Sequence, residues 1–326
     1  MMKGYKGFKK DFKCQGMQYE VGKEFSVDGE LKICENGLHF CKYPLDVFGY
    51  YGPSVSRFAE VEALGEVKSE DSNNFIEKDS KMCTNKLKVC TEIGVPDLVD
   101  AAVDYIKDKA YYTNKTQETI VESQNTSGYG IAVNRHKFSI AINKSLYSAA
   151  INTGDRSLAT NIGAYSTAIN TGDFGIATSA GVRSIASSTG DSSSAINESE
   201  HSAAINVGYD SVAINMGEHS VAATTGRAGM AINEGYQSLA TTIGYGSAAV
   251  ATRKGSIAIS FGCKGVAKGP LGSWIVLSEW VCGNKVGKDV CVVKDVKCFK
   301  VDGKDILPDT FYKLVDGKPV IAKEEE

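Results

Sequence analysis

Histidine and cysteine near the start of the chain form the group of residues best suited to metal chemistry. His39 and Cys41 alternate along one expected strand and share a face of it, and Cys34 lies close by in the sequence. Zinc binds such nitrogen and sulfur ligands, but a fourth ligand and the usual Cys-x-x-Cys spacing are missing. We therefore expect a buried histidine beside packed thiols, with no metal ion and no cofactor.

Other candidate ligands recur at intervals of eighteen residues. His201 and His219 would stack at one corner of adjacent coils, and so would Asp155, Asp173 and Asp191. We expect the histidines to be exposed corner residues. Three stacked carboxylates repel one another unless solvent or a cation intervenes, but the glycine-aspartate pattern of calcium-binding nonapeptides is absent. A calcium ladder is therefore the less favoured alternative.

Aromatic residues crowd the same corners. Aromatic side chains on a rigid frame often anchor protein interfaces, and the alternative is that they pack over neighbouring corners. The candidate binding residues are Tyr147, Tyr165, Phe174, Tyr209, Tyr236 and Tyr245, together with His201 and His219. No phosphate-binding glycine loop, Ser-His-Asp arrangement or carboxylate pair stands out, so we expect no catalytic residue and no enzyme activity.

A nine-residue repeat covers residues 130–268 and must position these side chains. Sixteen copies of Ser-x-Ala-Ile-Asn-x-Gly-x-x follow one another without insertion, and every copy starts with Ser or Gly and has Ala at its third position. Such a strict period predicts a mainly β protein built on a parallel β-solenoid, or β-roll, in which each repeat is a short strand and a corner. We expect the glycine to supply the positive φ angle of that corner.

A weaker period of eighteen residues predicts how many strands make one coil. Thr-Gly-Asp triplets occur at 153–155, 171–173 and 189–191, and the repeats between them lack the triplet. The simplest arrangement is a coil with two sides, so that two parallel sheets face each other. About eight coils at a strand spacing of ~4.8 Å would make a rod roughly 38 Å long. A three-sided coil is the alternative.

The alternation within a repeat indicates which side chains share a face. We place the apolar second and fourth positions inside, because two exposed apolar sheets would aggregate, and the alanines outside. Either this flat alanine face packs against another copy as a dimer or trimer, or alanine is instead the crowded interior position. Asparagines at the fifth position should form hydrogen bonds along the rod. The structural positions singled out are Ala150, Ala159, Ala168, Ala204 and Ala213, with Asn152, Asn170, Asn206 and Asn215.

The repeat divides the chain into an α+β domain (1–112), a linker or first cap (113–129), the solenoid (130–268) and a β capping domain (269–326). Asp-Gly and Asn-Gly dipeptides at 28–29 and 36–37 predict hairpins around strands at 31–34 and 38–41. A strand at 56–63 and a helix from Pro96 to about Lys109 should follow. In the last domain we expect a strand at 273–277 and hairpins at 302–303 and 316–317.

Charge and composition narrow the classes of partner. The chain has a formal net charge of −3, and residues 130–262 carry eight basic and eight acidic side chains, so nucleic-acid binding is not expected. No apolar stretch of membrane length and no signal peptide is visible, which predicts a cytoplasmic protein without membrane contact. Nine cysteines without Cys-x-x-Cys spacing predict reduced thiols.

Several long motifs resemble known proteins. The runs GYKGFKKDFKCQGMQYEVG, ICENGLHFCKYPLDVFGYY and SRFAEVEALGEV resemble the N-terminal domain of an uncharacterised family in phages and prophages. The tail GSWIVLSEWV with VDGKDILPDTFYKLVDGK is similar to the C-terminal piece of such proteins. The repeat also resembles the head domains of trimeric autotransporter adhesins, which form left-handed β-rolls, although this chain keeps strict nines and lacks a secretion signal and membrane anchor. The resemblance implies a phage origin and supplies no catalytic residue.

These observations favour a non-enzymatic phage or prophage protein. We expect it to bind a host protein or protein complex in the cytoplasm of the bacterial cell, and to inhibit or sequester a defence-related factor. A virion or assembly component, homo-oligomeric like the adhesin heads, is the first alternative. An unrecognised enzyme in the N-terminal domain around His39 is the second.

Overall fold

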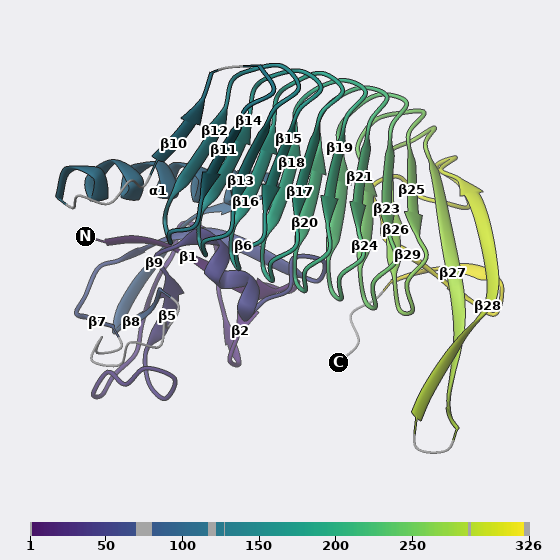
Figure 1. Ribbon diagram of the computed structural model, residues 1–326. Helices are drawn as coiled ribbons and strands as arrows, with labels where there is room; N and C mark the ends of the chain where they lie inside the picture. Colours follow the sequence, from purple (N-terminus) through teal and green to yellow (C-terminus); the bar gives the residue numbers. More distant parts are fainter. Residues whose placement is uncertain (1, 70–79, 117–121, 127, 286–287, 323–326) are drawn as a thin grey trace. The chain divides into compact units, whose positions relative to one another are not determined.

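A computed structural model describes residues 2–69, 80–116, 122–126, 128–285 and 288–322. The backbone forms two compact units, Met1–Tyr105 and Ile106–Glu326. Figure 1 shows the chain coloured from the N-terminus in purple to the C-terminus in yellow. The protein is mainly β, as the repeat predicts.

The first unit is built on an antiparallel sheet with the strand order β4-β9-β6-β1-β5-β8-β7. A hairpin of β2 and β3, the 3₁₀ helix η1 and the start of helix α1 complete it. The bounds are β1 (Met2–Lys9), β2 (Lys13–Cys14), β3 (Met17–Gln18), β4 (Glu24–Ser26), β5 (Leu38–Cys41), η1 (Pro44–Gly49), β6 (Ser56–Ala63), β7 (Val67–Ser69), β8 (Lys81–Thr84), β9 (Lys86–Ile93) and α1 (Val95–Thr116).

Most of the expected elements of this unit are confirmed, and one is wrong. The strand at 56–63 is β6, the strand at 38–41 is β5, and a helix begins beside Pro96. The strand expected at 31–34 is absent from the described residues, where only an isolated bridge joins Lys32 to Asn36. The segment between Asp28 and Gly37 forms a loop instead, with its turn at residues 33–35, and both glycines have positive φ angles.

The second unit contains two ladders of parallel strands, which we call the even sheet and the odd sheet (Figure 1). The even sheet contains β10 (Glu122–Asn125), β12 (Ile140–Asn143), β14 (Leu158–Asn161), β16 (Ile176–Ser179), β18 (Ser194–Asn197), β20 (Val212–Asn215), β22 (Met230–Asn233), β24 (Ala248–Ala251) and β26 (Val266–Lys268). The odd sheet contains β11 (Ile131–Asn134), β13 (Ala149–Asn152), β15 (Thr167–Asn170), β17 (Ile185–Ser188), β19 (Ala203–Asn206), β21 (Val221–Thr224), β23 (Leu239–Thr242), β25 (Ile257–Ser260) and β27 (Trp274–Lys285).

Each strand pairs with the strand eighteen residues later, so the coil has two sides and the three-sided alternative is wrong. Ala150 lies opposite Ala168 in the odd sheet, and Ala159 lies opposite Ala177 in the even sheet. Over the described residues each ladder has nine parallel strands, one more than expected, because β10 and β27 extend the solenoid beyond the regular repeats.

The alanine column faces the interior of both sheets, so the placement of alanine outside is wrong. On the even sheet the second positions of β12 to β24 are nevertheless buried. Ala150, Ala168 and Ala204 are fully buried, and the alanines of both sheets from Ala159 onward form one core cluster. On the odd sheet the second and fourth positions point outward and keep exposed surface. The space between the sheets accepts only a methyl group at this position, which explains why alanine never varies.

Asparagine and serine fill the rest of the interior and form hydrogen bonds there. Asn152 donates from Nδ2 to the carbonyl oxygen of Ser139 (3.1 Å) and accepts from the backbone N–H of Gly154 (3.0 Å). In the other column Asn143 donates to Oδ1 of Asn161 (2.9 Å), as expected for amides stacked along the rod. Buried polar groups are stable only when bonded in this way. Asn170, Asn206 and Asn215 repeat these contacts.

The glycine at the seventh position of a repeat serves close approach and not a positive φ angle, contrary to our expectation. A Cβ on Gly172 would collide with the carbonyl group of Gly154 in the preceding coil. The positive φ angle belongs to the ninth position instead, for example Tyr147 (52°) and His201 (56°). Coil spacing thus favours glycine at the seventh position, where His136, Ser145, Ser199 and Arg253 are the exceptions. The ninth position tolerates side chains in the left-handed region.

The C-terminal strands are β28 (Lys288–Lys300), β29 (Tyr312–Val315) and β30 (Lys318–Ile321). The strand expected at 273–277 is the first part of β27, and the hairpin at 316–317 joins β29 to β30. The hairpin expected at 302–303 is wrong, because β28 pairs with β27 whereas β29 pairs with β26 and β30. The outer part of β27 and β28 extends from the solenoid as a two-stranded arm (Figure 1).

Candidate functional site

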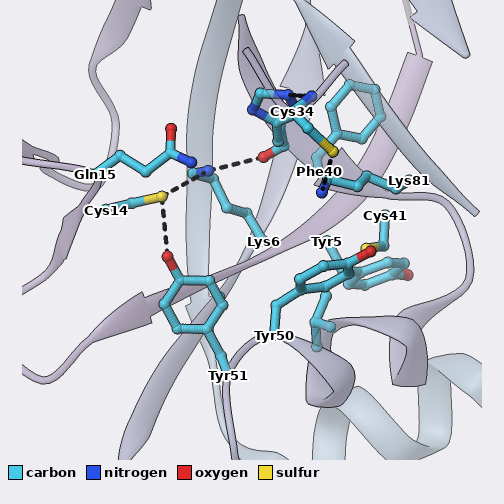
Figure 2. Close-up of a pocket in the computed structure, with 13 residues that line it drawn as sticks. Tyr5, Lys6, Cys14, Gln15, Cys34, Phe40, Cys41, Tyr50, Tyr51 and Lys81 are labelled. Atoms are coloured by element: carbon cyan, nitrogen blue, oxygen red, sulfur yellow. Dashed lines mark hydrogen bonds between the residues drawn. The ribbon is translucent and has the colours of Figure 1, made fainter. Parts of the chain in front are cut away.

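A pocket of about 320 Å³ opens in the first unit. Its walls come from β1, β2, β5, β8, and the segment around η1 (Figure 2). Thirteen residues line it, and they bring together two amines, three thiols, an imidazole and three phenols. A pocket that gathers so many reactive groups is a candidate binding or catalytic site.

Lys6 is the most unusual group in this pocket. The antiparallel pairing of β1 turns its side chain inward, where Lys6 is buried and only 4 % exposed. Its Nζ donates to the carbonyl oxygen of His39 (2.8 Å) and to Sγ of Cys14 (3.3 Å). Burial lowers the pKa of the amine, with partial compensation from Cys14. An amine that loses its proton more readily is a better nucleophile.

Tyr51 approaches Cys14 from the opposite side. Its hydroxyl donates to Sγ of Cys14 (3.0 Å), so the thiol accepts hydrogen bonds from both Lys6 and Tyr51 (Figure 2). The ring of Tyr51 lies against the backbone of Gly7, where a Cβ would overlap it. Glycine at that position therefore permits the ring to reach the sulfur.

His39 is only partly buried and the neighbouring Cys34 is exposed, whereas the sequence predicted a buried histidine beside packed thiols. Its Nε2 accepts from the backbone N–H of Cys34 (3.0 Å), and Lys81 donates to Sγ of Cys34 (3.2 Å). Burial, with smaller contributions from Lys6 and Lys81, lowers the pKa of His39 to about 4. Within the described residues, His39, Cys34 and Cys41 do not form a cluster at metal-binding distances.

Four of the predicted binding residues lie on one edge of the solenoid. Tyr147 stacks on Tyr165 at 5.1 Å between ring centroids, and His201 stacks on His219 at 5.2 Å. Sequence reasoning missed two members of this column, although both fall at the same ninth position. We call the whole column the corner ladder; it contains Tyr129, Tyr147, Tyr165, Arg183, His201 and His219.

The other predicted aromatic residues do not join the corner ladder. Phe174 lies on the opposite edge and stacks under the guanidinium of Arg156 (4.8 Å). Tyr236 and Tyr245 lie beside the guanidinium groups of Arg253 and Arg227 in a neighbouring coil, and Tyr209 is 58 % exposed. Successive corners lie on alternate edges, so Tyr209 and Tyr245 share the edge of Phe174. Tyr236 lies on the edge of the corner ladder, where its carbonyl oxygen accepts from the backbone N–H of His219 (3.1 Å).

The aspartate column has a structural role. The carboxylate of Asp155 accepts from the backbone N–H of Asp173 (3.0 Å), and that of Asp173 accepts from the backbone N–H of Asp191 (2.9 Å). Each carboxylate thus binds the next coil through a backbone donor, which offsets the repulsion between neighbours. This contact is a structural reason for an aspartate at every second corner of this segment.

The outward side of the odd sheet is uncharged. It contains the second and fourth positions of β11 to β25, which we call the odd outer face. All sixteen side chains keep partial or full exposure: Ile131, Val133, Ala149, Ile151, Thr167, Ile169, Ile185, Ser187, Ala203, Ile205, Val221, Ala223, Leu239, Thr241, Ile257 and Ile259. A contiguous apolar surface of this length on a soluble protein usually marks an interaction site. The corner ladder borders it, because each ladder residue lies two positions before an odd strand.

These features define a parallel β-solenoid protein with an N-terminal sheet domain and a small C-terminal β region. Residues 2–101, which contain the pocket, match a family described as a domain of unknown function (DUF7666). No curated protein and no solved structure matches the chain. Among the helices in the described ranges, none is long and apolar enough to cross a membrane.

Proposed function

We propose that this is a non-enzymatic binding protein that engages a partner protein through the odd outer face and the corner ladder. The absence of charge from all sixteen outward side chains is the observation that carries the proposal. The sequence resemblance to phage proteins supports a finer form, in which the partner is a host factor that the protein inhibits or sequesters.

The area of the odd outer face indicates that a partner would also contact the corner ladder. Eight strands at ~4.8 Å and four residues at ~3.3 Å give a flat area of about 500 Å². A standard interface buries about 800 Å² on each partner, so the odd outer face alone is too small. The adjoining corner ladder adds aromatic and cationic side chains, the types that contribute most to binding energy.

Charge insertion tests the proposal. Ile169→Lys with Ile205→Lys places two charges in the middle of the odd outer face. Thr171→Lys with Thr225→Lys, at exposed corners beyond the same sheet, is the matched control. The bait is the full chain immobilised in lysate of a bacterial host, and bound proteins are identified by mass spectrometry.

The wild type and the control should retain the same partner, and the face variant should lose it. Retention by the face variant would refute the proposal. If the wild type is a multimer by light scattering and only the face variant is monomeric, the partner is a second copy. Presence in purified virions would then support the structural alternative.

The pocket favours a second candidate function, a small-molecule or catalytic site in the first unit. The buried amine of Lys6 can attack a carbonyl carbon, and loss of water then gives a Schiff base. Borohydride reduction after incubation with a small aldehyde would fix that adduct on Lys6. We expect peptide mapping to find the adduct in the wild type and not in Lys6→Met. Labelling spread over exposed lysines alone would exclude this function.

A further inference from the structure

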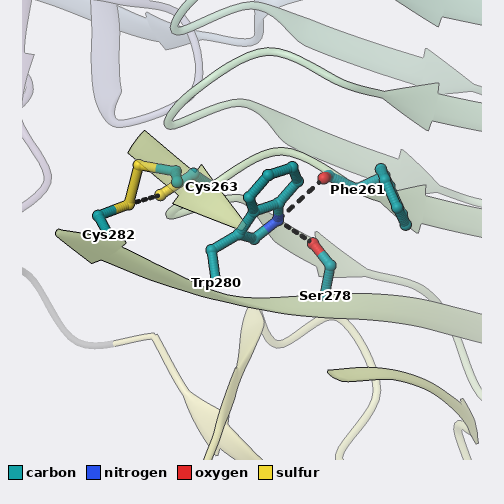
Figure 3. Close-up of a disulfide and its surroundings, with 6 residues drawn as sticks. Phe261, Cys263, Ser278, Trp280 and Cys282 are labelled. Carbon is teal, nitrogen blue, oxygen red and sulfur yellow. Dashed lines mark hydrogen bonds between the residues drawn. A yellow bond between two sulfur atoms is a disulfide. The ribbon is translucent and has the colours of Figure 1, made fainter. Parts of the chain in front are cut away.

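Three cysteines meet where the arm leaves the solenoid. Cys263 lies in the corner between β25 and β26, and Cys282 and Cys291 lie directly opposite each other on β27 and β28. Cys282 and Cys291 form a disulfide, so the expectation that every thiol is reduced is wrong for this pair. Sγ of Cys263 is 3.6 Å from Sγ of Cys282, and all three sulfur atoms lie within 4.8 Å of one another (Figure 3).

The fold holds this arrangement without help from the disulfide. The indole N–H of Trp280 donates to the carbonyl oxygen of Phe261 (3.1 Å) and to Oγ of Ser278 (2.9 Å). Its ring also contacts the ring of Phe261 edge-on at 5.9 Å. Trp280 lies two residues before Cys282, and Phe261 lies two residues before Cys263. These contacts therefore keep the arm beside the corner when the disulfide is open (Figure 3).

We propose that the reduced forms of Cys263, Cys282 and Cys291 bind one thiophilic metal ion of the zinc type. Zinc–thiolate bonds of about 2.3 Å in a tetrahedron place neighbouring sulfur atoms about 3.8 Å apart. The separation of 3.6 Å between Cys263 and Cys282 already fits this spacing. Cys282 and Cys291 are exposed, so an ion can enter from solvent and keep water as its fourth ligand.

The disulfide is the closed form of this site. A dithiol reductant supplies two electrons and two protons, the bond between Cys282 and Cys291 breaks, and the reductant becomes a disulfide. The metal ion then replaces the protons of the three thiols, which leave to solvent. Oxidation of the pair removes two of the three ligands and releases the ion.

Cadmium and zinc provide direct probes. The full chain is reduced with a phosphine and titrated with Cd²⁺, whose thiolate complexes absorb ultraviolet light. A second titration uses Zn²⁺ in competition with a chromophoric chelator. We expect one ion per chain and at least a tenfold loss of affinity in Cys263→Ser. The matched control is Cys298→Ser, an exposed cysteine on β28 outside the cluster, which should bind as the wild type does.

Protection of thiols locates the ion. Bound Zn²⁺ should shield Cys263, Cys282 and Cys291 from alkylation, and one equivalent of peroxide should release it. Equal affinity of the wild type and Cys263→Ser would overturn the proposal, and so would shielding confined to the cysteines of the first unit. A disulfide between Cys263 and Cys282 in the metal-treated protein would overturn it as well, because it would indicate thiol exchange instead. Circular dichroism of each variant separates loss of the site from loss of the fold.

Discussion

The interior position of alanine makes a sharp prediction for Ala204→Leu. Ala204 is fully buried in the middle of the odd sheet and pairs in register with Ala186 and Ala222, both of which are fully buried too. Leucine would add three carbon atoms to a space that holds one methyl group. Its neighbours belong to hydrogen-bonded ladders on both sides, so they cannot move apart without breaking those bonds.

Overpacking of this kind costs about 1 to 3 kcal/mol, and we expect the upper end of that range because backbone and not side chain must shift. Ala203→Leu is the matched control, since Ala203 precedes Ala204 on β19 and points outward with part of its surface exposed. Its effect should stay within about 0.5 kcal/mol.

Urea unfolding followed by far-ultraviolet circular dichroism measures the difference. The free energy of unfolding should fall for Ala204→Leu and stay nearly constant for Ala203→Leu, with the same dependence on urea in both. Equal stability of the two variants would show that the space between the sheets can expand, and the reasoning about alanine would fail.

Two further changes test the corner and the pocket. Gly172→Ala places a Cβ against the carbonyl of the preceding coil, so we expect the free energy of unfolding in urea to fall by about 3 kcal/mol. Gly246 has a φ of 66°, and a Cβ added there meets no atom within 4 Å, so Gly246→Ala should lose only about 1 kcal/mol. If Gly172→Ala loses no more stability than Gly246→Ala, close approach to the preceding coil does not explain the glycine at position 172. The pKa of His39 falls to about 4 in the folded chain, below the 6.5 of the free group, so the unfolded chain binds a proton first as the pH drops. The contribution of His39 to the free energy of unfolding should therefore be complete above pH 6.5 and decline toward pH 4. The decline should amount to about 1 kcal/mol, because the ring is partly exposed to solvent. His39→Gln should flatten this decline, and an unchanged decline would show that other groups cause it.

The sequence by itself determined the solenoid. An unbroken period of nine predicts the strands, and the triplets every eighteen residues predict a two-sided coil, because backbone pairing between coils requires a constant step. It also predicted hydrogen bonds of the asparagines along the rod and the stacking of the histidines, but not the burial of the asparagines. Local patterns in the first unit sufficed for β6 and the start of α1, since alternation and capping residues act within a few positions.

The tertiary structure alone decided which face is inside. Hydrophobicity favoured the isoleucines, but the distance between the sheets admits only small side chains, and a distance is not written in the order of residues. The corner glycines also depend on tertiary structure, because the carbonyl group of the preceding coil leaves no room for a Cβ.

The candidate sites also depend on contacts between distant segments. Lys6, Cys14 and Tyr51 meet because a sheet and a loop bring them together, and no local spacing signals that pocket. Cys263 and Cys282 meet because the arm of β27 and β28 starts beside the last corner. No local pattern predicts this arm, because no Asn-Gly or Asp-Gly dipeptide joins its two strands. Periodicity determines what repeats along a chain, whereas the space between packed elements determines what faces inward and which side chains meet.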